Sequence, residues 1–224
     1  MQSRTHIAAV LTFVSSCAFS SVASAQDGVI PLVAAYEVRI TKALSGGNSI
    51  DRAVTGQFYR DSRGRTRLEV DGRISISDPV ARVAVFLDPS AHLAKRVVLP
   101  QPSTQPRVNP AFPASSPPRE IAGRLIEGFE TVGKEYTFTI PEGKMGNKAP
   151  IIQTIRTWYS ANLKMPLLTV SSDEISGERS QSFRALQVGR EPDASLFRIP
   201  ADYTVQDVTI PAKSATLPGT SALR

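Results

Sequence analysis

The sequence predicts a mainly β protein: a single curved antiparallel sheet, or half-barrel, of about eleven strands with few short helices. Three observations support this prediction. From Val33 onward, apolar and polar residues alternate with a period of two, as in strands with one buried face. Turn-forming residues recur about every 10–15 residues, which indicates an antiparallel meander. No sustained 3.6-residue period follows the N-terminal segment.

The N-terminal residues 1–25 have the features of a cleavable export signal. Arg4 supplies a positive charge, Ile7 to Val14 is an almost uninterrupted apolar run, and Ala23 and Ala25 give the small-x-small pattern of a cleavage site. The run is shorter than the roughly 20 apolar residues that a membrane-spanning helix needs. We therefore expect an exported protein, periplasmic or extracellular, with no transmembrane segment in the mature chain.

A lipoprotein signal is the alternative interpretation of this segment. In it, Val14 to Cys17 forms the lipoprotein box, and Cys17 becomes the lipidated first residue. Apolar residues continue past Cys17, and a suitable cleavage site follows, so we favour the cleavable signal. A buried N-terminal helix is a third interpretation, but the segment shows no periodic polar face.

The composition limits the chemistry of the mature chain. Removing the signal removes Cys17 and His6, which leaves no cysteine and one histidine, His92. Disulfides, thiolate nucleophiles and Cys/His zinc sites are therefore excluded. The net charge of +6 becomes +5 without Arg4, because 25 basic residues then face 20 acidic ones. For an exported protein this favours an anionic lipid, a cell-wall polymer or an acidic partner over nucleic acid, although solvated strand faces would also explain it.

The expected elements follow one another with turns between them. Turns are predicted at 61–64, 71–72, 88–90 and 127–128, where Asp or Glu precedes Gly or Pro. A single helical turn is expected at 192–197, with Leu196 and Phe197 in the core. β-branched and aromatic residues fill the strands. The expected strands are 33–43, 52–61, 65–71, 73–78, 81–88, 92–99, 122–127, 129–140, 151–160, 166–173 and 178–189.

One domain is expected over residues 26–207, interrupted by a proline-rich loop. Residues 100–119 contain seven prolines, which cannot donate hydrogen bonds within a sheet. We interpret this segment as a flap or partner-docking loop, or as a tolerated insertion. Residues 208–224 are small and polar and are expected to form a flexible tail.

No motif indicates catalysis, a metal or a cofactor. A Ser-His-Asp triad would have to use His92, and no Gly-x-Ser-x-Gly motif occurs. The acidic residues Asp61, Asp71, Asp173 and Glu174 lie beside turns, where such residues are common for conformational reasons. We therefore expect a protein without catalytic residues, metal ligands or cofactors.

Apolar side chains in or beside the expected strands are the candidate ligand-binding residues. A curved sheet with few helices leaves a concave face that can hold an apolar guest. Ordinary core packing is the alternative for most of these side chains. The candidates are Phe58, Leu68, Phe86, Phe138, Trp158, Met165 and Phe183.

Three segments resemble outer-membrane lipoprotein-sorting proteins of the LolA/LolB type, and the mature chain as a whole resembles a family of uncharacterised exported bacterial proteins. The resemblance implies a half-barrel of eleven strands whose concave face holds acyl chains under a helical lid. This sequence departs from the pattern in lacking clear lid helices and in its proline-rich segment. The segments are Phe58–Arg67, Trp158–Gly177 and Pro192–Tyr203.

The function predicted from the sequence is therefore the non-catalytic binding of an apolar or acyl ligand in the cell envelope. Two alternatives stay open. The same sheet could bind an envelope protein, as an interaction or sensor module, or the protein could be a hydrolase of unknown type.

Overall fold

The computed structural model describes residues 28–99 and 117–208. The expected export signal with Cys17, most of the proline-rich segment and the expected tail after residue 208 lie outside these residues. The described chain forms twelve strands in one sheet and two short 3-10 helices, η1 (Ser45–Gly47) and η2 (Ala194–Phe197). No helix in this part of the chain is long and apolar enough to cross a membrane.

The strands lie close to the expected ranges. They are β1 (Leu32–Ala43), β2 (Ser49–Arg60), β3 (Thr66–Val70), β4 (Arg73–Asp78), β5 (Val83–Asp88), β6 (Leu93–Val98), β7 (Arg119–Ile126), β8 (Phe129–Ile140), β9 (Ile151–Ser160), β10 (Met165–Asp173), β11 (Gly177–Val188) and β12 (Thr204–Val208).

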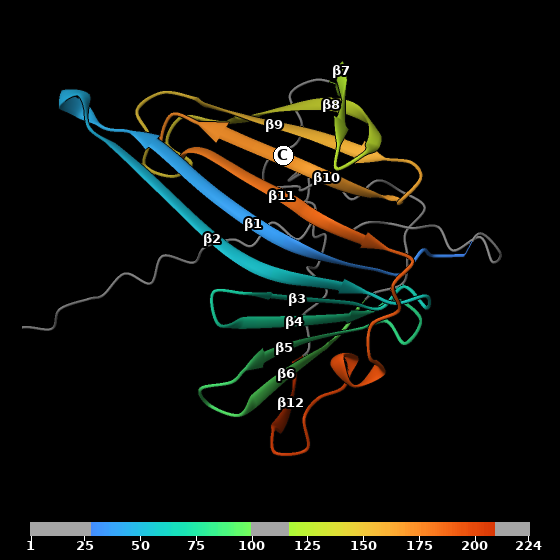
Figure 1. Ribbon diagram of the computed structural model, residues 1–224. Helices are drawn as coiled ribbons and strands as arrows, with labels where there is room; N and C mark the ends of the chain where they lie inside the picture. The colour runs from blue at the N-terminus through green and yellow to red at the C-terminus, as the bar shows by residue number, and fades with distance from the viewer. Residues whose placement is uncertain (1–27, 100–116, 209–224) are drawn as a thin grey trace, which may run out of the picture.

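The sheet consists of two meanders joined at its centre. Strands β1 to β6 follow one another on one side, β7 to β11 follow one another on the other side, and β1 pairs with β11 between them (Figure 1). Every pairing is antiparallel except that of β12 with β6. The predicted single curved, mainly antiparallel sheet is confirmed, with β12 as a strand that the sequence did not indicate.

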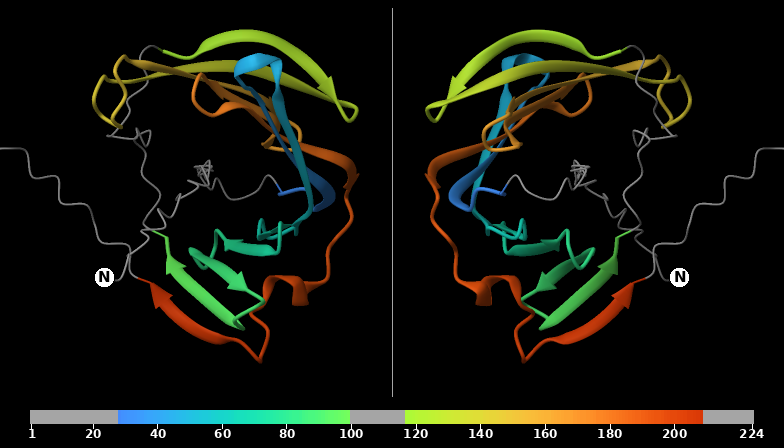
Figure 2. Two further views of the ribbon diagram at one scale, coloured as in Figure 1. Left: turned by 90° about the vertical axis from the view of Figure 1, so that its left-hand side faces the viewer. Right: turned by 90° about the vertical axis from the view of Figure 1, so that its right-hand side faces the viewer.

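The sheet is strongly curved and open. Figure 2 shows it nearly edge-on as an open C, with η2 and the segment before it on the outer side. Register shifts between Val33 and Ala35, between Pro166 and Leu168, and between Ile121 and Arg124 interrupt the ladders. Such irregularities bend a strand and increase its twist, so they contribute to the curvature.

Strand register assigns most side chains to one of two faces, because directly paired residues in antiparallel strands point to the same side. We call "inner face" the side that carries Ala34, Tyr36, Phe58 and Phe183, which are paired across β2, β1 and β11. The outer face is the opposite side. Figure 2 places η2 outside the C, and Phe197 of η2 packs on the outer face, so the inner face is the concave one.

The outer face is covered at the β4–β6 end. Ile76, Val85, Leu87 and Ala94 form a buried cluster with Phe197. Asp193 caps η2 because its side chain accepts a hydrogen bond from Ser195 N, 2.8 Å away. The expected helical turn, with Phe197 buried and Leu196 partly buried, is thus confirmed.

A second cluster holds the centre of the sheet together. It contains Leu32, Ala34, Leu163, Met165 and Leu167, each at most 7% exposed. Leu163 lies in the β9–β10 turn, and its burial places this turn against the start of the central strand β1. The packing therefore ties the two meanders together near one end of their strands.

Candidate functional site: the inner face of the sheet

The inner face brings together five of the seven apolar residues that the sequence indicated. Phe58 pairs with Leu68 across β2 and β3, and Phe183 pairs with Tyr36 across β11 and β1. The pairing of successive strands puts Phe86 on the same face as Leu68, through β4. It also puts Phe138 on the same face as Phe183, through β10 and β9. The five are Phe58, Leu68, Phe86, Phe138 and Phe183.

Three aromatic rings form the centre of this face. The centroid of the Phe183 ring lies 4.9 Å from that of Phe58 and 5.2 Å from that of Tyr36, in tilted or edge-on arrangements that aromatic pairs favour. The hydroxyl group of Tyr36 donates a hydrogen bond to Oε1 of Gln181, 2.8 Å away. Phe58 and Phe183 remain partly exposed. The centre is therefore an apolar surface with a single polar group at its margin.

The periphery of the inner face also carries apolar side chains, and some of them are exposed. Phe86 is 47% exposed on β5. Phe138 on β8 is partly buried, as is its neighbour on the same face, Tyr136. These side chains lie on the two arms of the C. The arrangement could accept an elongated apolar ligand against the centre and the arms.

Several ion pairs of the sheet lie on the outer face. Arg39 contacts Asp51 at 3.3 Å, and Arg96 contacts Asp207 at 2.6 Å. Arg67 and Glu69 pair at 2.5 Å. Strand register puts all of these side chains on the outer side. The outer face therefore carries charged side chains that pair with one another, whereas the centre of the inner face is apolar.

Glu135 is the centre of the largest of these outer ion-pair groups. Its carboxylate accepts hydrogen bonds from Arg156 at 2.8 Å and from Arg119 at 2.7 Å, which join β7, β8 and β9. Hydrogen bonding to Arg156 and then Arg119 holds the pKa of Glu135 below its usual range. The carboxylate therefore stays ionised and bridges three strands.

Trp158 lies on the outer face, apart from the other candidates. It pairs with Gly133 of β8, and its Nε1 donates a hydrogen bond to the carbonyl oxygen of Ala122, 3.0 Å away. The guanidinium carbon of Arg124 lies 4.0 Å from the ring centroid, a cation–π contact. Because Gly133 has no side chain, β7 can fold closely over this position. Trp158 therefore attaches the edge strand β7 to the sheet.

Met165, the seventh candidate, belongs to the buried central cluster. Its side chain is 6% exposed and packs in the group with Leu163 and Leu167. Phe58 and Phe183 pack against the same cluster, and the burial of Met165 leaves little surface for a ligand.

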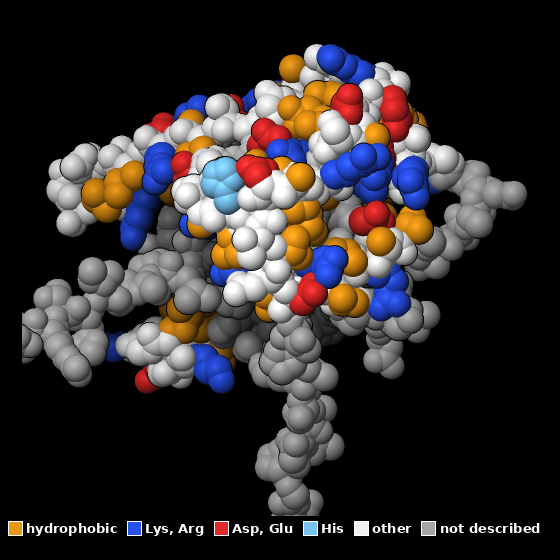
Figure 3. Space-filling model, turned by 90° about the horizontal axis from the view of Figure 1, so that it is seen from below, with side chains coloured by type: hydrophobic (Ala, Val, Ile, Leu, Met, Phe, Trp, Pro, Cys, Tyr) orange, Lys and Arg blue, Asp and Glu red, His pale blue; other side chains and the backbone are white. Residues whose placement is uncertain are grey.

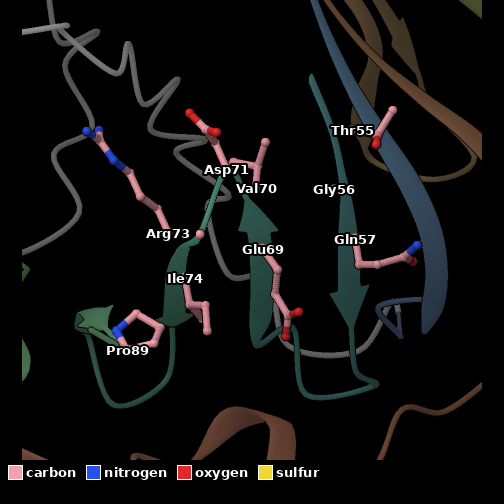
Figure 4. Close-up of a pocket in the computed structure, with 10 residues that line it drawn as sticks. Thr55, Gly56, Gln57, Glu69, Val70, Asp71, Arg73, Ile74 and Pro89 are labelled. Atoms are coloured by element: carbon pink, nitrogen blue, oxygen red, sulfur yellow. The ribbon is translucent and has the colours of Figure 1, made fainter. Parts of the chain in front are cut away.

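A shallow hollow of about 300 Å³ lies beside β2, β3 and β4 (Figure 4). Strand register puts Gln57, Glu69 and Ile74, which line it, on the outer face. Asp71, Arg73 and Pro89 complete its rim. Glu69 is already paired with Arg67. Gly56 and Val70, which the register puts on the inner side, also line the hollow, but Tyr36, Phe58 and Phe183 do not.

His92, the only histidine of the expected mature chain, lies on the surface. Its Nδ1 is 2.7 Å from Oδ2 of Asp202, and both side chains are about 60% exposed. Figure 3, seen from the β12 side, shows the histidine among mixed charged and apolar side chains. The backbone N–H of Thr204 donates to the carbonyl oxygen of His92, so this contact holds the start of β12. Within the described ranges, no three His, Cys, Asp or Glu side chains are grouped to hold a metal.

Tyr36, Val38 and Val70 are inner-face residues that the sequence reasoning did not select. The alternation of buried and less buried residues along β1 contained the signal for Tyr36 and Val38. Val70 lies on the same face as Tyr36 and Val38 because of the way β2 pairs with β3. Only a known register could have placed it on the same face.

No protein-family model and no curated protein matches the sequence. Solved structures do align with it. A LolA superfamily protein from Nitrosomonas europaea aligns over 76% of this chain and 90% of its own, with 12% identity and a TM-score of 0.37. A Vibrio parahaemolyticus domain named for outer membrane lipoprotein sorting aligns over 77% and 91%, with 10% identity and a TM-score of 0.34.

A chain of the MucA/MucB complex of Pseudomonas aeruginosa aligns over 80% of this chain but only 59% of its own, with 13% identity and a TM-score of 0.36. Chains described as lipoprotein-sorting proteins, the group that the sequence resembles, are thus among the structures that align with this chain. At these TM-scores the likeness says nothing about a ligand of this protein.

Proposed function

We propose that this protein is a non-catalytic component of the cell envelope that binds an acyl chain or similar apolar ligand on the inner face of its sheet. The observation that carries the proposal is the aromatic centre on the concave side, where Phe58 and Phe183 are partly exposed beside the buried Tyr36. Burying such a surface under a ligand is favourable by roughly 25 cal/mol per Å².

The separation of charge supports the same proposal. Ion pairs that join neighbouring strands, such as Arg39–Asp51 and Arg96–Asp207, lie on the outer face, whereas the centre of the concave side is apolar. Contiguous apolar surface rimmed by polar residues is typical of binding sites. The export signal expected at residues 1–25 fits a site of action in the envelope.

Native mass spectrometry of the protein purified from its own envelope tests this proposal. We expect an added mass corresponding to a lipid or acylated molecule. Ligand-free protein that also fails to bind a fluorescent fatty acid would contradict the proposal.

Two matched variants locate the binding surface. Phe86 on the inner face and Ile152 on the outer face are both exposed strand residues, at 47% and 52%. Phe86→Gln should weaken the binding of the fluorescent fatty acid several-fold, because the replaced ring belongs to the proposed surface. Ile152→Gln should leave the affinity unchanged. Equal affinities for both variants would count against the inner face as the site.

Protein–protein binding through a free sheet edge is a second candidate. β12 is an edge strand, and its Val205 and Val208 are 43% and 40% exposed. An unpaired strand edge can accept a strand from a partner. Replacing Gln206 with proline would block this pairing, and loss of an envelope partner in pull-down experiments, with fatty-acid binding intact, would favour this second function.

A further inference from the structure

The inner face changes its chemistry along the strands. Next to the paired aromatic residues Tyr36 and Phe183 comes the pair Val38 and Gln181, and then the pair Ile40 and Arg179. Along β11, the four steps from Phe183 to Arg179 span about 13 Å. A ligand lying along these strands would therefore meet an apolar surface at one end and an arginine at the other.

Positive charge predominates at this second end. On β1, β2 and β11 the inner positions carry Lys42, Arg52 and Arg179, and the neighbouring strand β10 carries one acid, Asp173. Arg52 contacts Asp71 at a long 3.7 Å, with both side chains well exposed. Three cations from three adjacent strands thus lie near one another on the concave side.

The one inner acid at this end is already engaged. Oδ1 of Asp173 accepts hydrogen bonds from the backbone N–H groups of Ile175 at 2.9 Å and Ser176 at 2.7 Å. Oδ2 accepts a longer one from Nε2 of Gln153, at 3.5 Å. The carboxylate is therefore held in the β10–β11 turn and does not neutralise the basic residues.

Arg179 has no such partner. Its side chain is partly buried, and within residues 28–99 and 117–208 its guanidinium group makes no hydrogen bond or ion pair. A partly desolvated cation without a counter-ion is unfavourable, and an anion placed beside it is correspondingly favoured. On the outer face, by contrast, arginines such as Arg39 and Arg96 are paired with carboxylates.

We propose that the ligand of the inner face is an anionic phospholipid, whose acyl chain lies on the aromatic centre and whose phosphate is bound by Arg179. Lys42 and Arg52 add positive potential around the phosphate. A phosphate offers several acceptor oxygens, which suits three donors from three strands better than a carboxylate does. This inference depends on the proposed function, because it specifies the head group of the same ligand.

Two lysophospholipids with the same acyl chain test the inference, each titrated below its micelle concentration. Lysophosphatidylglycerol carries a net negative charge, and lysophosphatidylcholine is zwitterionic. The full-length protein should bind the anionic lipid about five- to tenfold more tightly, an advantage that decreases with added salt. Arg179→Gln should remove this preference and leave the affinity for lysophosphatidylcholine unchanged.

Arg184→Gln is the matched control. Arg184 lies on the same strand but pairs with Ala35 on the outer face, is exposed, and has no ion pair among the described residues. It should keep the full preference. Equal binding of both lipids by the unmodified protein, or a preference that survives Arg179→Gln, would overturn the head-group inference but leave acyl binding in place. If neither lipid binds, the proposed function itself fails, and the head-group inference fails with it.

Discussion

Arg60 is a buried cation whose hydrogen bonds all go to backbone carbonyl oxygens. It is 7% exposed and donates to the oxygen of Ile30 from Nε and Nη2, and to that of Leu163 from Nη1 at 2.8 Å. Burial lowers the pKa of this guanidinium group. Arg60 thereby connects β2 to the β9–β10 turn, across the central strands β1 and β11.

Arg60→Met should lower the free energy of unfolding by roughly 2–3 kcal/mol, because two buried carbonyl oxygens lose a charged donor. Urea denaturation measures this change. Arg63→Met in the next turn is the control, since that side chain is exposed and has no partner among the described residues, and it should have little effect. Equal stabilities of the two variants would show that Arg60 does not hold the turn.

Gly56 is required by the close approach of β3 to β2. A Cβ atom added at this position would overlap the carbonyl oxygen of Glu69. Gly56→Ala should therefore destabilise the protein by at least about 2 kcal/mol, because backbone has to move. Gly28→Ala, where an added Cβ meets nothing within 4 Å, should be nearly neutral. Thermal denaturation followed by circular dichroism would compare them, and a stable Gly56→Ala variant would contradict the tight packing of these strands.

The stability of the edge formed by β7, β8 and β9 depends on the ionised carboxylate of Glu135. Because the pKa of Glu135 is lowered in the folded protein, its contribution to stability is complete above the unfolded-state value of about 4.3 and is lost as the pH falls through the folded value. At neutral pH, the Glu135→Gln variant should have a lower free energy of unfolding than the unmodified protein. Between about pH 5 and pH 3, the free energy of unfolding of the variant should fall by less than that of the unmodified protein.

Glu174→Gln is the control for this prediction. Glu174 is exposed and has no ion pair within the described chain. Its replacement should leave the pH dependence of the unfolding free energy unchanged. Superimposable pH profiles for the Glu135 and Glu174 variants would contradict the role of the Arg119–Glu135–Arg156 group.

Local sequence patterns predicted most strands, but not β12. The eleven expected strands had period-two alternation and turn residues beside them. The five residues of β12, in contrast, are all exposed and pair in parallel with β6, more than a hundred positions earlier in the chain. Nothing local in that segment indicates such a partner. Its contacts, among them those between Arg96 and Asp207, exist only once the fold has formed.

The local sequence pattern also could not predict on which face of the sheet a side chain lies. Trp158 and Phe183 both alternate with polar neighbours, yet they point to opposite sides, because the ladder from β11 to β9 gives them opposite parity. The registers of β11 with β10 and of β10 with β9 put the two side chains on opposite faces. Such long-range pairing is not encoded in any short window of sequence.

At the scale of the whole molecule, the two faces of one curved sheet have different roles. The outer face carries the ion pairs between strands, the packing of η2 and the attachment of β7 through Trp158. The inner face carries the aromatic centre and the basic residues Lys42, Arg52 and Arg179. Phe58 and Phe183 also pack against the buried cluster that joins the two meanders, so the centre of the inner face contributes to stability, whereas exposed inner residues such as Phe86 can be replaced with less effect on the fold.

Photo-crosslinking with a diazirine-bearing fatty acid, followed by tandem mass spectrometry to locate each adduct, tests the central claim most directly. If the inner face binds acyl chains, the adducts will lie on inner residues around Phe58, Leu68 and Phe183, and unlabelled fatty acid will compete for them. Competable adducts on the outer face, for example at Phe197 or Ile152, or adducts spread without preference over both faces, would contradict the claim.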